Sequence, residues 1–158
     1  MTDDTPDRLL PELERLDPWS FWVASGEEFG ADRIVIGTTG AFILVVTQEE
    51  GYVNVSLGKV KIGGKPVASV KSLKRKARKL KNKLSGMAVY ADVAAVICPT
   101  NAILGGPRDV KGVWVAKPTD AVKVISRRAN VIPRQTAKRA AQALGAKMRS
   151  VRPDSRDS

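Results

Sequence analysis

The clearest local pattern in the chain is a pair of apolar segments separated by a polar turn, over residues 32–47. The segment reads DRIVIGTTGAFILVVT, and its two apolar runs flank Gly37, Thr38, Thr39 and Gly40. Apolar runs on either side of a glycine-containing turn predict a β-hairpin. The second run, AFILVV, contains no polar residue, which is typical of a buried strand.

The segments around this hairpin show further helix and strand patterns. Residues 8–17 predict a short helix that ends before Pro18, and residues 51–67 alternate apolar and polar side chains. This alternation predicts one or two half-exposed strands. We also expect strands within 20–28, at 92–99 (DVAAVICP, covered on both faces) and at 112–117 (GVWVAK), a short helix over 118–128 capped near Thr119, and a last helix over 133–150 that starts at Pro133.

Residues 69–86 predict an amphipathic helix. Five apolar residues at spacings of 3, 4, 3 and 4 form one narrow stripe, with Ser69 as the expected N-cap and Gly86 as the stop. The other faces are basic. Eight cationic residues fall within 13 positions, with no acidic residue between them: Lys71, Lys74, Arg75, Lys76, Arg78, Lys79, Lys81 and Lys83.

The order of elements predicts an α/β fold. A helix, three or four strands, a helix, two strands and further helices fit a mixed β-sheet core flanked by helices. At 158 residues the chain has the length of one domain. We assign this domain to residues 8–150 and expect disordered tails at 1–7 (acidic) and 151–158.

The charge of the chain is divided between its two parts. Residues 1–50 hold 3 basic and 11 acidic residues, a net charge of −8, whereas residues 51–158 hold 24 basic and 5 acidic residues, a net charge of +19. The two sum to the overall +11. A basic body of this kind favours polyanionic partners.

The absence of histidine excludes several classes of chemistry. Serine–histidine and cysteine–histidine catalysis and histidine-containing zinc sites are ruled out, and the single cysteine rules out thiolate metal sites. Any metal ion would therefore be a hard, oxygen-bound one such as Mg²⁺. Cys98 lies in an apolar stretch, where we expect a buried thiol. No apolar run approaches the roughly 20 residues of a membrane span, and a cytoplasmic protein without a membrane partner is expected.

The hairpin and the segments after it resemble the NERD (nuclease-related domain) family. The resemblance rests on an aspartate before an apolar strand, a glycine-containing turn and the strand GAFILVV. It continues through the helix VKSLKRKARKLKNKL and through ADVAAVICPTNAILGGPRDVKGVWVAKPTDAVKVI, and it covers residues 20–128. This resemblance implies a restriction-endonuclease-like (PD-(D/E)xK) fold. It also implies Mg²⁺-dependent DNA cutting in members whose strand ends in Glu/Asp-x-Lys, with two carboxylates that hold the ion and a lysine that positions the attacking water.

The motif of that family is degenerate in this chain. If Thr38 and Thr39 form a two-residue loop, Asp32 lies opposite Val45, with Thr47 on the same face of the sheet. Asp32 then takes the place of the first carboxylate, but Val45 and Thr47 stand where the second carboxylate and the lysine should be. Other candidate metal ligands, with Asp32, are Glu27 and Glu28, whereas Glu49 and Glu50 are expected to be solvated turn charges.

Three hypotheses of function follow. The first is a nuclease-related domain with an inactive metal site, which needs no cofactor and binds nucleic acid, DNA rather than RNA, nonspecifically through the eight cations of the basic helix. The second is an active Mg²⁺-dependent endonuclease that uses Asp32 with Glu27 or Glu28. The third is a protein-interaction module. Residues that could extend the basic surface are Arg127, Arg128, Arg134, Lys138, Arg139, Lys147 and Arg149, whereas Trp19, Phe21, Trp22 and Trp114 are expected in the core.

Overall fold

The structure of the chain, a computed structural model, describes residues 9–146. In chain order the elements are α1 (Leu9–Leu13), β1 (Phe21–Ser25), the 3₁₀ helix η1 (Glu27–Phe29), β2 (Arg33–Gly37), β3 (Gly40–Thr47), β4 (Gly51–Ser56), β5 (Lys59–Ile62), β6 (Lys65–Ser69), α2 (Val70–Gly86), β7 (Val93–Pro99), β8 (Ala102–Ile103), β9 (Arg108–Val110), β10 (Val113–Val115), α3 (Pro118–Ser126) and α4 (Arg134–Ala143). The expected tails at 1–7 and 151–158 lie outside the described residues.

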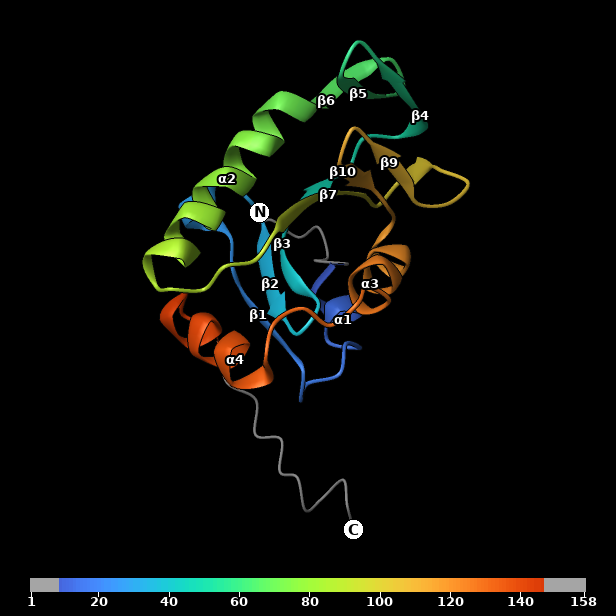
Figure 1. Cartoon of the computed structure of the whole chain (residues 1–158). Helices are drawn as coiled ribbons and strands as arrows, with labels where there is room; N and C mark the ends of the chain where they lie inside the picture. Colours follow the sequence, from blue (N-terminus) through green and yellow to red (C-terminus); the bar gives the residue numbers. More distant parts are fainter. Residues whose placement is uncertain (1–8, 147–158) are drawn as a thin grey trace.

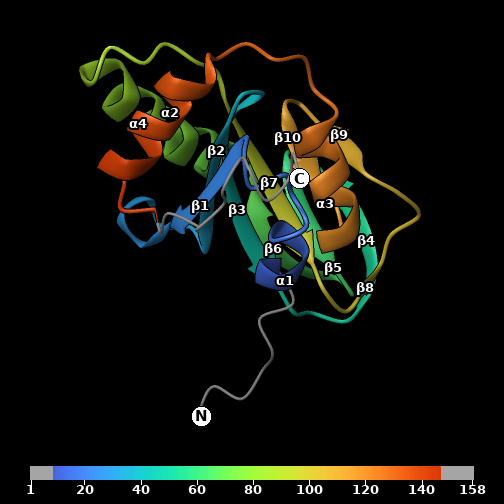
Figure 2. The ribbon, with the colours of Figure 1, turned by 90° about the horizontal axis from the view of Figure 1, so that it is seen from below.

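A six-stranded mixed sheet forms the centre of the fold. Its strand order is β1-β2-β3-β7-β10-β9. Strands β1 to β3 are antiparallel, β3, β7 and β10 run parallel, and β9 is antiparallel to β10. Helices α2 and α4 cover one face of the sheet, and α1 and α3 cover the other (Figures 1 and 2). The predicted α/β class, with a mixed sheet flanked by helices, is confirmed.

Alternating side chains of the central strands build two separate cores. On β3, Ile43 faces the α2 and α4 side, whereas Phe42 and Leu44 face the α1 and α3 side. On β7, Ile97 and Cys98 divide in the same way. Because successive side chains of a strand point to opposite faces, an unbroken apolar run serves both cores. The predicted burial of the 92–99 strand on both faces is confirmed.

A second, smaller sheet stands beside the N-terminal end of α2. Its order is β6-β5-β4-β8, and β4 to β6 form a meander that leads directly into α2 (Figure 1). Residues 51–69 thus hold three strands, so the expectation of one or two was too low. Glycines at both turns (Gly58 and Gly64, each with positive φ) let the chain reverse twice within this short span.

Two other expectations about local structure are wrong or incomplete. The short helix α3 is not capped at Thr119, because Lys117 is its N-cap residue, makes no side-chain cap bond and is followed by Pro118. Proline replaces capping here, since its fixed φ suits the first helical position. The strands β8 and β9 were not predicted, because two or three residues carry no readable alternation.

No helix among the described residues is both long and apolar enough to span a membrane.

Candidate functional site

The basic helix α2 forms as its sequence predicts. Ser69 is the N-cap, and its Oγ accepts a hydrogen bond from Ser72 N at 3.1 Å. The apolar stripe is buried along its whole length: Val70, Leu73, Ala77, Leu80 and Leu84. Burial of this stripe against the sheet leaves the cationic side chains on the remaining faces of the helix.

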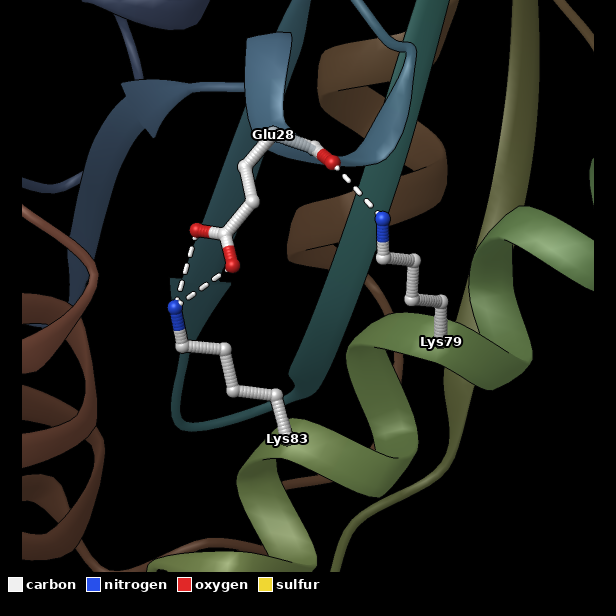
Figure 3. A network of polar contacts seen from close by, with 3 residues as sticks. All are labelled: Glu28, Lys79 and Lys83. Atoms are coloured by element: carbon white, nitrogen blue, oxygen red, sulfur yellow. Dashed lines mark hydrogen bonds and ion pairs between the residues drawn. The ribbon is translucent and has the colours of Figure 1, made fainter.

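Four of the eight cations are engaged by other parts of the chain. The Lys83 Nζ donates to both carboxylate oxygens of Glu28 at 2.8 Å, and the Lys79 Nζ donates to the Glu28 carbonyl at 3.1 Å (Figure 3). The Lys76 Nζ donates to the Gly30 carbonyl at 3.0 Å, and Lys81 lies 3.4 Å from an oxygen of Asp92. We call these four residues the inner cations. They hold α2 against η1 and the loop before β7.

The other four cations face solvent. Lys71, Lys74, Arg75 and Arg78 are exposed, and their side chains have no ion-pair or hydrogen-bond partner within residues 9–146. We call them the outer cations. They line a groove of about 700 Å³ between α2 and the β4–β5 turn.

This groove gathers further positive charge from outside the helix. Lys59, at the start of β5, and Lys111, in the β9–β10 turn, line it beside the outer cations, and no acidic residue of the described chain does so. Six like charges in one groove repel each other unless an anion is present. The sequence could not reveal this gathering, because Lys59 lies in β5 and Lys111 in the β9–β10 turn, and only tertiary packing brings them beside α2.

The predicted pairing of the hairpin is confirmed. Gly37 pairs with Gly40 and Arg33 with Leu44. Asp32 lies just before β2, and its backbone N donates to the Leu44 carbonyl at 2.9 Å. Its Oδ2 accepts a hydrogen bond from Val46 N at 2.7 Å. The Asp32 carboxylate therefore has a structural role, because it accepts a hydrogen bond from a backbone N–H of β3 at the end of the β2–β3 pair.

Asp32 and Thr47 border one cavity of about 510 Å³, which Val45 does not line. Glu49, expected to be a solvated turn charge, also lines it, and its carboxylate lies 3.8 Å from the Lys65 ammonium. Thr47 Oγ1 is buried and has no partner in the described chain.

The residues of this cavity fit a Mg²⁺ ion poorly. One of the two carboxylates already accepts a backbone hydrogen bond, and the other faces a lysine. Glu28 is bound by Lys83, and Glu27 is exposed on η1, where its backbone N donates to Ser25 Oγ at 3.2 Å. Among residues 9–146, no group of three or more aspartate, glutamate or cysteine side chains is placed to hold a metal ion.

The aromatic and basic residues outside α2 behave in different ways. Phe21 and Trp22 are buried, as expected, whereas Trp19 and Trp114 are half-buried. The Arg134 guanidinium lies 3.5 Å from the centre of the Trp19 ring, and its Nε donates to the Trp19 carbonyl at 2.7 Å. Arg134 thus fastens α4 to the chain before β1 and is withdrawn from the basic surface. Lys147 and Arg149 lie outside the described residues.

Cys98, on β7, is buried beneath the α1–α3 layer, as predicted. Burial, with a smaller contribution from the Asp32 carboxylate, raises the pKa of its thiol far above the ordinary range. The thiol therefore stays protonated in the folded chain and is a poor nucleophile.

The raised pKa of Cys98 predicts a loss of stability in alkali. Above about pH 8.5 the unfolded thiol loses a proton that the folded thiol keeps, so the free energy of unfolding falls by up to about 1.4 kcal/mol per pH unit. Below that pH the thiol is protonated in both the folded and the unfolded state, so its titration does not lower the free energy of unfolding. Urea denaturation between pH 7 and 10 should show a steeper decline for the wild type than for Cys98→Ala. Parallel declines would contradict the prediction.

Comparison of the chain with protein-family models, with curated proteins and with solved structures finds no match.

Proposed function

We propose that this chain is a nuclease-related domain of the NERD type that binds DNA without base specificity and no longer cuts it. The observation that carries the proposal is the groove beside the start of α2, which is lined by six cations without an acidic residue of the described chain. Evenly spaced phosphates are the partner that such a groove suits best. The mixed sheet between helix layers is compatible with a restriction-endonuclease-like fold.

The cationic contacts of this groove would not read base edges. Its charged side chains are lysines and arginines that extend from a helix, a strand and a turn, and no aromatic residue among 9–146 lines it. Lysine and arginine contacts to phosphate position a duplex but do not read bases. Each such contact releases counterions, so affinity falls steeply with salt.

The residues around Asp32 and the end of β3 support the loss of cutting. The hydrogen bond from Val46 N occupies its Oδ2, Val45 offers no ligand atom, and Thr47 lacks the positive charge of the family lysine. Mg²⁺ sites of this kind use one or two carboxylates together with substrate phosphates. A protein with this strand end should bind DNA and leave it intact.

Fluorescence anisotropy with an end-labelled duplex and a parallel cleavage assay test the proposal. Four to six phosphate contacts predict that log K falls with log [salt] at a slope of about −3.6 to −5.4. In Mg²⁺ or Mn²⁺, supercoiled plasmid should stay uncut with the wild type and with Asp32→Ala alike.

The two assays separate the proposed function from its alternatives. Cutting by the wild type that Asp32→Ala abolishes would establish the active nuclease. No binding at low salt would overturn the DNA-binding proposal and leave the protein-interaction module.

A further inference from the structure

The tip of the β4–β5 hairpin carries a residue that its backbone conformation disfavours. Ser56 pairs with Lys59, which leaves Leu57 and Gly58 as a two-residue turn with φ of 53° and 74°. Two successive residues with positive φ suit Asn-Gly or Gly-Gly, whereas leucine is uncommon in this region of backbone space. Local turn chemistry therefore does not account for leucine at this position.

The side chain of Leu57 also makes no contribution to the core. It is 98% exposed, the highest value among the large hydrophobic residues that are exposed in the described chain. Because an exposed leucine gains nothing from burial, neither packing nor backbone preference explains it. Residues held in sparsely populated backbone conformations are concentrated at functional sites.

The tip is held firmly beside the basic groove. The Gly58 carbonyl accepts a hydrogen bond from Val70 N, the first residue of α2, at 2.9 Å. Leu57 and Gly58 line the same groove as the outer cations, Lys59 and Lys111. One exposed apolar side chain thus stands at the rim of a groove whose charged residues, within the described chain, are all cationic.

We propose that Leu57 is a wedge that enters the minor groove of a bound DNA duplex and partly unstacks one base step. This inference rests on the proposed function, since the cations of the groove must hold the backbone on which the wedge acts. Apolar side chains that insert in this way kink the duplex toward the major groove, and flanking lysines and arginines hold the backbone. Insertion needs no base-specific hydrogen bond, so it is compatible with nonspecific binding.

The wedge also defines which duplexes bind best. Pyrimidine–purine steps unstack most easily, so a TA or CA step should be preferred over an A-tract of the same length. Duplex RNA should bind without a kink, because its minor groove is wide and shallow. The ligand class is therefore B-form DNA that can be bent.

The substitution Leu57→Asn tests the wedge without harming the fold. Asparagine is favoured in a turn with positive φ, so the melting temperature should stay the same or rise. A 20-base-pair duplex with a central TA step and a donor–acceptor pair at its ends reports bending by energy transfer. The wild type should increase the transfer, Leu57→Met should do so equally, and Leu57→Asn should leave it at the value of free DNA, with affinity lowered by roughly threefold to tenfold.

Tyr90→Asn is the matched control. Tyr90 is 78% exposed in the loop between α2 and β7 and does not line the groove. The Tyr90→Asn variant should bend DNA as the wild type does. Wild-type binding without increased transfer, or equal bending by Leu57→Asn, would overturn the wedge and leave the proposed function standing. If the wild type does not bind the duplex at low salt, both fail.

Discussion

Replacing Lys71, Lys74, Arg75 and Arg78 together by glutamine should weaken the binding of duplex DNA at least roughly 100-fold at 0.1 M salt. The salt slope should become shallower by about 3.6, because each lost phosphate contact removes about 0.9. Anisotropy titrations of both proteins over a range of salt concentrations measure both effects. These outer cations have no partner within residues 9–146, so their neutralisation breaks no internal contact.

A charge-matched control isolates the position of the charges from their number. Glutamine at Lys123, Arg127, Lys138 and Arg139 removes four other positive charges from α3, its C-cap and α4. Arg127, Lys138 and Arg139 were expected to extend the basic surface, but none of the four residues lines the groove. This variant should keep most of the wild-type affinity. If the two variants lose affinity equally, the net charge of the chain governs binding and the groove does not.

The second large effect concerns the stability of the helix that carries the groove. Leu80 is 0% exposed and belongs to the apolar stripe of α2. Leu80→Ala should lower the free energy of unfolding by about 2–5 kcal/mol, because it removes buried methyl groups and leaves a cavity. Against a total of about 5–15 kcal/mol for a domain, this is a large fraction.

Urea denaturation followed by circular dichroism measures this loss, and Asn82→Ala is its control. Asn82 is exposed on the same helix, so its replacement should change stability by no more than about 0.5 kcal/mol. The midpoint should shift in Leu80→Ala without a change in the denaturant slope. An equal, small effect of both substitutions would mean that α2 is not packed on the sheet through this stripe.

The β2–β3 hairpin and helix α2 could be predicted because their sequence patterns are local. The pairing of Gly37 with Gly40 follows from a two-residue loop, and the stripe of α2 follows from the spacing of its apolar residues. Very short strands could not be predicted, because a local pattern needs several residues. The strand β8 spans only Ala102–Ile103 and shows no alternation of apolar and polar side chains. The error at Thr119 arose because a capping residue and a proline at the first helical position are alternative ways to begin a helix.

The candidate site at Asp32 could be predicted only in part. The register places Asp32 at the end of the β2–β3 pair, but its bond to Val46 N and the arrival of Glu49 at the same cavity depend on how the chain turns after β3. The alternation of a strand predicts which way its own side chains point, but it does not predict the direction of side chains in the turn that follows.

The sequence by itself determined that α2 has one apolar stripe and eight cations, because both follow from the order of residues along a single helix. Only the tertiary structure decided which cations remain available to a partner. Glu28 neutralises Lys83 from a position 55 residues away, whereas Lys59 and Lys111 approach the outer cations from the start of β5 and from the β9–β10 turn. Charge pairing and the position of Leu57 depend on distances through space, which the chain acquires only when distant segments pack together.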